Sequence, residues 1–101
     1  MSLRDLGRRE IALLRLYTDC QFQMSPRAFS AKWNVTRSQM ARICGCSVST
    51  ADRWYARPTN YRAPAPIYQR RLAEMDFLWE RWDEISPALK ERFCPPPEPA
   101  E

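Results

Sequence analysis

This sequence has many arginines, and their side chains can bind an anionic partner. All sixteen basic residues except Lys32 and Lys90 are arginine, and the chain has no histidine. The planar guanidinium group forms paired hydrogen bonds with phosphates and with base edges, which a lysine ammonium group cannot do. The composition therefore favours a polyanionic partner, although a genome rich in G and C would also raise the arginine content.

The distribution of charge along the chain adds to this indication. Residues 1–71 hold thirteen basic against four acidic residues, a net charge of +9, whereas residues 72–101 hold three against eight, a net charge of −5. A basic body followed by an acidic end suits a nucleic-acid partner. Charge alone leaves open a basic surface that binds nothing.

The four cysteines are the candidates for metal ligands or nucleophiles. Cys44 and Cys46 are one residue apart, which is too close for a zinc-binding pair, and no second pair follows them. We expect both thiols to be free and buried, with no metal and no cofactor. The sequence offers no histidine base, nucleophile constellation or phosphate-binding glycine loop, so an enzyme is the least expected class.

The sequence predicts no membrane partner. It has no run of 18 apolar residues, and its first ten residues lack the apolar stretch of a signal peptide. We therefore expect a cytoplasmic, nucleoid-associated protein, and no small-molecule substrate is evident.

Apolar spacing and capping residues predict an all-α fold. Helices are expected at about 6–20, 26–34, 37–44, 48–56 and 66–85, with a short sixth helix after Ser86 and Pro87. The alternation of valine and isoleucine that strands need is missing. The prediction is one helical domain over residues 1–92, and a disordered tail rich in proline and glutamate over residues 93–101.

Capping signals are strongest in the middle of the chain. Thr36 and Gln39 have the spacing of a capping box, and Ser47 can cap the next helix. Gly45 lies between these helices and can take the left-handed conformation that ends the first of them. Two helices joined by a tight turn are therefore expected within residues 36–57.

The segment SQMARICGCSVSTADRW, residues 38–54, resembles the helix-turn-helix of bacterial and phage transcription regulators. That family has a small residue in its first helix and glycine four residues later. A Ser or Thr then caps the second helix, which carries a small residue and, three further on, a bulky one. The matching residues are Ala41, Gly45, Ser47, Ala51 and Trp54. The resemblance covers about one fifth of the chain.

The resemblance implies that the second helix enters the major groove of DNA. Arg53 would then bind O6 and N7 of a guanine, and Asp52 would accept from a cytosine or orient Arg53. Val48 would contact a thymine methyl group. Alternatively, Arg53 is only a charged side chain in solvent that contacts no base. The implied DNA-binding residues at the two helices are Arg37, Gln39, Ser47, Val48, Ser49, Thr50, Asp52 and Arg53.

Arginines outside the two helices could add phosphate or minor-groove contacts. Arg57 and Arg62 lie in a proline-rich loop that could act as an arm, or serve only as a connector. Arg70 and Arg71 begin the long helix and could hold phosphates.

An apolar heptad stripe runs along the predicted long helix. Its residues are Tyr68, Leu72, Met75, Trp79 and Trp82, spaced 4, 3, 4 and 3 apart. The stripe could pack on the rest of the chain and build the core, or form the interface of a homodimer centred on Trp79 and Trp82. Both can hold if different edges of the stripe are used.

These observations predict a sequence-specific, double-stranded-DNA-binding transcription regulator that acts as a homodimer on a pseudo-palindrome. An excisionase-like architectural DNA-binding accessory factor is one alternative. A protein-interaction adaptor that uses the helix-turn-helix as a scaffold is another.

Overall fold

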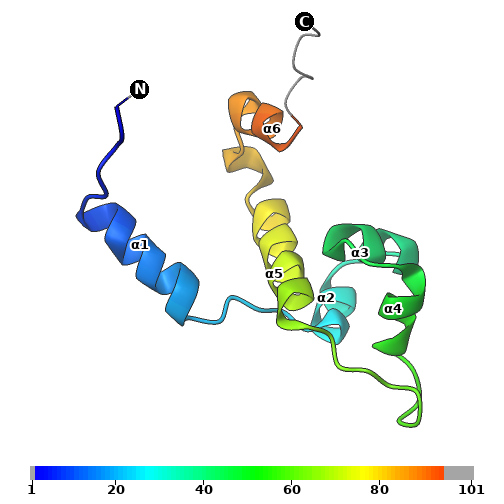
Figure 1. The fold of residues 1–101 in the computed structure, drawn as a ribbon. Helices are drawn as coiled ribbons and strands as arrows, with labels where there is room; N and C mark the ends of the chain where they lie inside the picture. The colour runs from blue at the N-terminus through cyan, green and yellow to red at the C-terminus, as the bar shows by residue number, and fades with distance from the viewer. Residues whose placement is uncertain (1, 95–101) are drawn as a thin grey trace, which may run out of the picture.

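The computed structural model describes residues 2–94, and it confirms the all-α prediction (Figure 1). No strand occurs within this range. The elements are α1 (Arg8–Asp19), α2 (Pro26–Lys32), α3 (Arg37–Cys44), α4 (Val48–Arg53), α5 (Pro66–Glu80), a 3-10 turn η1 (Trp82–Glu84) and α6 (Pro87–Phe93). The predicted tail falls almost wholly on residues 95–101, outside the described residues.

Four helices begin where their capping residues predict. Ser25, Thr36, Ser47 and Ser86 each accept a hydrogen bond from the backbone N–H three residues later, at 3.0–3.1 Å. At α3 the box is complete, because Gln39 Oε1 also accepts the N–H of Thr36 at 2.9 Å. These side chains satisfy donors that have no partner within the helix.

Helix ends agree less well with the sequence prediction. α5 ends at Glu80 rather than near residue 85, and α2 and α4 are also shorter by two or three residues. Arg81 leaves the helical conformation with φ −111° and ψ 29°. Beyond it, the Trp82 indole packs under the Lys90 ammonium group, which lies 3.6 Å from the ring centroid. This contact with α6 depends on tertiary structure, so helical periodicity does not reveal it.

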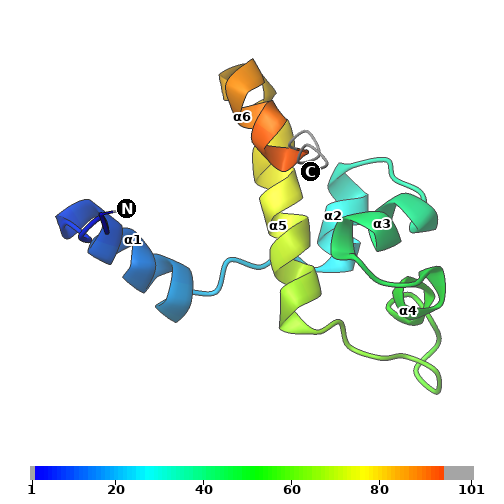
Figure 2. The ribbon, with the colours of Figure 1, turned by 45° about the horizontal axis from the view of Figure 1, so that its top comes forward.

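The core lies where α5 packs against α2 and α3, with α4 packed on α3 (Figure 2). An ion pair joins Lys32 of α2 to Asp76 of α5 at 2.8 Å, and the indole N–H of Trp33 donates to the same carboxylate at 2.9 Å. The Lys32 ammonium group accordingly holds the pKa of Asp76 below its ordinary value. The buried core cluster is Phe29, Met40, Ala41, Cys44, Ala51, Trp54 and Leu72.

The heptad stripe belongs mainly to this core. Leu72 is fully buried, and Tyr68, Met75 and Trp79 pack against the buried cluster. The prediction that the stripe builds the core is thus confirmed for these four residues. Trp82 is the exception, with 58% of its surface exposed. Because Leu72 is fully buried, it is not available to a partner chain. A homodimer interface through the partly buried stripe residues stays a prediction.

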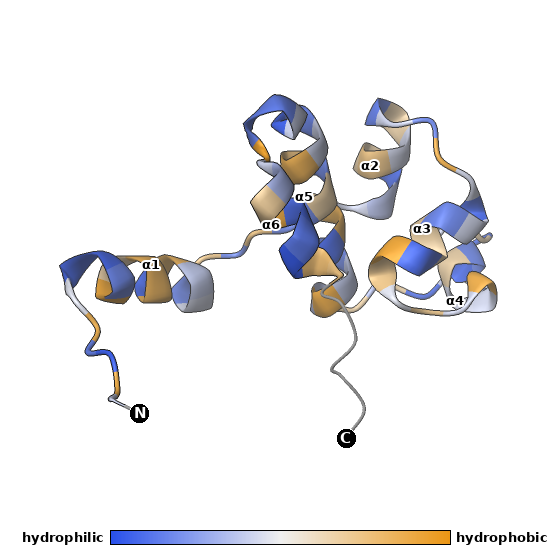
Figure 3. Cartoon of the chain, turned by 90° about the horizontal axis from the view of Figure 1, so that it is seen from above, coloured by the Kyte–Doolittle hydropathy of each residue, from blue (hydrophilic) through white to orange (hydrophobic). Residues whose placement is uncertain are grey.

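Helix α1 stands apart on the opposite side of α5 from α2, α3 and α4 (Figures 1, 2 and 3). None of its residues is buried. Arg70 holds its end, because Nη2 donates to the carbonyl oxygen of Tyr17 at 2.8 Å. The same guanidinium group lies 4.2 Å from the Tyr17 ring centroid. Arg70 therefore positions α1, a role that the phosphate-binding prediction missed.

The projecting helix makes the molecule extended for its length. The Cα radius of gyration is 17.2 Å, compared with about 13 Å for a compact chain of 100 residues. None of the helices among residues 2–94 is long and apolar enough to cross a membrane.

Candidate nucleic-acid interface

The turn between α3 and α4 depends on Gly45. This residue has φ +74° and ψ 35°, the left-handed conformation, and its N–H donates to the carbonyl oxygen of Ala41 at 2.8 Å. The N–H of Cys46 donates to the same oxygen at 3.0 Å. The chain can then turn sharply and start α4 at Val48, as predicted from the glycine and the following serine.

Replacing Gly45 by alanine should lower the free energy of unfolding by about 1–2 kcal/mol, because an L residue resists this conformation. A Cβ atom there would lie 3.8 Å from the nearest Arg71 atom, an ordinary contact, so the cost comes from the backbone. Gly45→Asn should lose less, since asparagine enters the left-handed region more readily. Urea denaturation of the two variants measures both losses. Equal losses would contradict the backbone explanation.

Helix α4 has one buried and one open face. Ala51 is fully buried and Trp54 is 2% exposed, with its ring 5.6 Å from that of Tyr68. Ala41 of α3 is also buried, as expected of a small residue where two helices approach closely. The outward face consists of the exposed residues Val48, Ser49, Asp52 and Arg53, beside the partly buried Thr50. The structure thus brings the predicted reading residues together on one accessible surface.

The Arg37 side chain packs against α4 and Tyr55 rather than pointing into solvent. Its guanidinium group lies 3.6 Å from the ring centroid of Tyr55, and its Nε is 3.6 Å from the carboxylate of Asp52. Its Nη1 is enclosed without a hydrogen-bond partner. Asp52 thus pairs with Arg37, and its proposed role in orienting Arg53 stays a prediction. Arg37 links the start of α3 to α4 by charge and by a cation–π contact.

Tyr55 connects α4 to α2 and to Arg37, a role that no sequence pattern predicts. Its hydroxyl donates to the carbonyl oxygen of Pro26 at 2.7 Å, which joins the end of α4 to α2. Its ring also supports Arg37. A tyrosine directly after a buried tryptophan carries no motif, so only the packing reveals its role.

The loop after α4 folds back toward the helix. The N–H of Arg62 donates to the carbonyl oxygen of Arg53 at 3.2 Å. Within the loop, the N–H of Asn60 donates to the carbonyl oxygen of Arg57 at 2.9 Å and closes a turn. Arg53 and Arg62 consequently line one polar hollow, together with Thr59, Asn60, Tyr61 and Ala63. The loop thus places a second arginine beside the open face of α4.

Arg71 acts within the chain as well. Its Nε donates to the carbonyl oxygen of Ile43 at 2.6 Å, near the end of α3, where carbonyl groups lack partners within the helix. This contact fixes α5 to the α3–α4 turn. The sequence predicts that Arg71 could hold a phosphate, but it does not predict the hydrogen bond to Ile43.

The cysteines are free thiols in the described part of the chain. Burial raises the pKa of Cys44 to about 11, and it also raises the pKa of Cys46. Cys44 is buried as predicted, whereas Cys46 is half-buried. No group of three or more acidic or cysteine side chains among residues 2–94 could hold a metal ion. The absence of metal from the protein stays a prediction.

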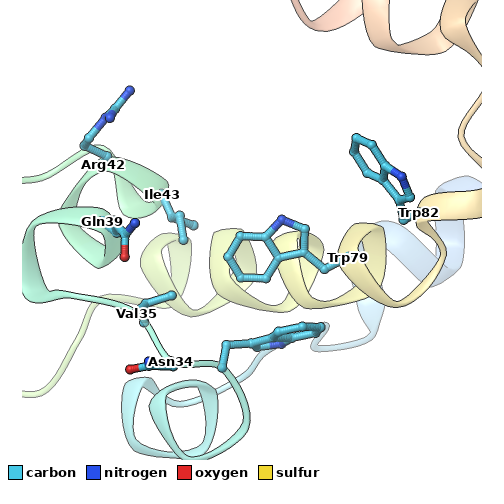
Figure 4. A pocket seen from close by; sticks show the side chains of 8 residues that line it. Asn34, Val35, Gln39, Arg42, Ile43, Trp79 and Trp82 are labelled. Carbon is cyan, nitrogen blue, oxygen red and sulfur yellow. The ribbon is translucent and has the colours of Figure 1, made fainter.

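An apolar groove lies on the other side of α3, between α3 and the end of α5 (Figure 4). Gln39 and Arg42 lie at one end, Trp82 at the other, and Trp79 between them. We call it the tryptophan groove. Its lining is Trp33, Asn34, Val35, Gln39, Arg42, Ile43, Trp79 and Trp82.

No protein-family model matches this chain, and neither the curated proteins nor the solved structures include a match to it.

Proposed function

We propose that the chain is a sequence-specific, double-stranded-DNA-binding transcription regulator, and that α3 and α4 are its helix-turn-helix. One observation carries the proposal. A short helix is held by its buried Ala51 and Trp54, and it presents Ser49, Asp52 and Arg53 outward, after a turn that requires glycine. A helix fixed on one side and polar on the other can place side chains against base edges in the major groove.

Charge supports the same proposal. Arg57 and Arg62 are exposed next to α4, and residues 1–71 carry a net charge of +9. Their guanidinium groups would neutralise phosphates on either side of the groove. In this proposal two copies bind a pseudo-palindrome in the nucleoid, because one such helix reads few base pairs. The proposed role is binding, and it requires neither catalysis nor a cofactor.

Selection of bound sequences from a random duplex pool, followed by titration of the best duplex, tests the proposal. If Arg57 and Arg62 each neutralise one phosphate in two copies, affinity should fall about 100-fold between 50 and 200 mM salt. Arg62→Ala should reduce the salt slope by about one per copy. A pool that yields no bound duplex at low salt would refute DNA binding and favour a protein-interaction role.

A further inference from the structure

Helix α1 has a wide apolar surface that remains largely exposed, with the Arg70 guanidinium group on the ring of Tyr17. Leu13, Leu16 and Tyr17 share one face and are 65%, 60% and 61% exposed. Its N-cap, Gly7, provides no side-chain hydrogen bond. A helix of 12 residues is marginal in water, and most helices in proteins are stabilised by packing of their apolar face. The helix therefore needs a partner surface in order to persist.

The tryptophan groove is the complementary feature. Trp33, Val35, Ile43 and Trp79 are only partly buried, and Trp82 is 58% exposed. Within residues 2–94, the apolar face of α1 and the tryptophan groove are therefore both open to a partner. The exposed apolar side chains of both features make them candidates for one contact.

The helix of the same chain cannot fill this groove while its anchors hold. The N–H of Met24 donates to the carbonyl oxygen of Gln69 at 3.1 Å, and Arg70 holds Tyr17 at 2.8 Å. The ring of Phe22 also packs on Phe77, with centroids 6.3 Å apart. These contacts keep α1 on the opposite side of α5 from α3, which borders the groove (Figure 1).

We propose that two copies of this chain exchange their α1 helices, so that the apolar face of each α1 lies in the tryptophan groove of the other copy. The exchange is self-complementary, as a two-fold dimer requires, because each copy gives one helix and receives one. It goes beyond the proposed DNA binding and is independent of it.

Charge selects the direction of the exchanged helix. α1 begins with Arg8 and Arg9 and ends at Asp19. Arg42 is the charged residue that lines one end of the groove, and at the other end the Lys90 ammonium group lies on the Trp82 ring. The acidic end of α1 at Asp19 therefore belongs at Arg42, which leaves its start at Trp82. The helix dipole favours the same direction, since its negative end would lie near Arg42.

Mass measurement by light scattering on the full chain tests the exchange without DNA. The wild-type protein should have twice the 11.9 kDa mass of one chain. Leu16→Asp and Trp82→Asp should each weaken the dimer about 30-fold or more, because each replaces a large apolar side chain of the contact with a carboxylate that has to be desolvated. Arg15→Asp places an aspartate on the side of α1 that carries Arg8 and Asp19, and it should leave the dimer intact. A wild-type monomer, or a ladder of larger masses, would overturn the proposal.

Mixing the two disrupted variants separates this exchange from a direct pairing of α1 with α1. A Leu16→Asp chain keeps an intact groove, and a Trp82→Asp chain keeps an intact α1. The mixture should therefore form heterodimers through one intact contact, whereas each variant alone stays monomeric. A mixture that remains monomeric would overturn the exchange, and so would a Trp82→Asp variant that dimerises like the wild type.

Disulfide trapping tests the direction. Cys20 ends α1 and is exposed. With Cys94 replaced by serine, Arg42→Cys should form an interchain disulfide with Cys20 under mild oxidation, and Asp83→Cys should not. The reverse result would overturn the assigned direction. Circular dichroism before oxidation verifies that every variant keeps its helical core.

Discussion

Replacing Phe29 by alanine should lower the free energy of unfolding by about 3–5 kcal/mol, the largest loss that we expect from a single substitution. Phe29 is fully buried, and its ring centroid lies 5.6 Å from that of Trp79, which also contacts Trp33 at 5.0 Å. The phenyl ring therefore joins α2 to α5. Its removal leaves a cavity between α2 and α5, and the Lys32–Asp76 ion pair at their surface does not fill that cavity.

Phe22→Ala provides the matched control. Phe22 loses the same atoms but is 47% exposed, so its replacement should cost about 1 kcal/mol or less. Urea denaturation measures both losses. Because a small domain has about 5–15 kcal/mol of stability, Phe29→Ala could unfold much of the sample, and Phe29→Leu then gives a milder step of about 1.5 kcal/mol or less. Similar losses at positions 29 and 22 would contradict this description of the core.

Local signals explain why much of the fold could be predicted from the sequence. Ser25, Thr36 and Ser47 begin their helices through hydrogen bonds that span three residues. Gly45 ends α3 through its own backbone conformation. Such features depend on the identity of a residue and its near neighbours. The sequence therefore predicted the start of α3, the turn and the start of α4.

Long-range packing explains what the sequence could not predict. Periodicity identifies an apolar face but not what covers it, and for this reason Leu72 and Trp79 left two interpretations open. The same ambiguity holds for α1, whose periodic leucines indicate burial although no part of the described chain buries them. The contact between Trp82 and Lys90, which follows the end of α5, is likewise not predicted by any local pattern.

The sequence did not predict which partner each arginine of the candidate site contacts. A guanidinium group donates to phosphates, carboxylates and carbonyl oxygens and also stacks on aromatic rings, so the residue type alone does not select the partner. Arg37 lies on Tyr55, Arg71 donates to Ile43 and Arg70 donates to Tyr17. The arginines that remain exposed beside α4 are Arg53, Arg57 and Arg62. The structure thereby narrows the candidates for DNA contact.

Replacing Arg53 by alanine should weaken binding to a selected duplex by about 1–3 kcal/mol, or about 5- to 150-fold, and should relax the base preference at one position. The exposed side chain lies on the open face of α4, and the contact between α4 and the following loop uses its backbone carbonyl group. The variant should therefore keep its fold. Arg57→Ala is the matched control, since it removes an exposed guanidinium group from the loop.

Binding curves on the selected duplex and on a scrambled duplex distinguish reading from positioning. Arg57→Ala should weaken both duplexes by the same factor, whereas Arg53→Ala should reduce the ratio between them. Arg53→Lys sharpens the test, because lysine keeps the charge but lacks the paired donors that match guanine O6 and N7. It should preserve the salt slope and lose the base preference. If Arg53→Ala and Arg57→Ala change the two duplexes equally, Arg53 contacts phosphate, and the reading of bases must come from Ser49, Thr50 or Asp52.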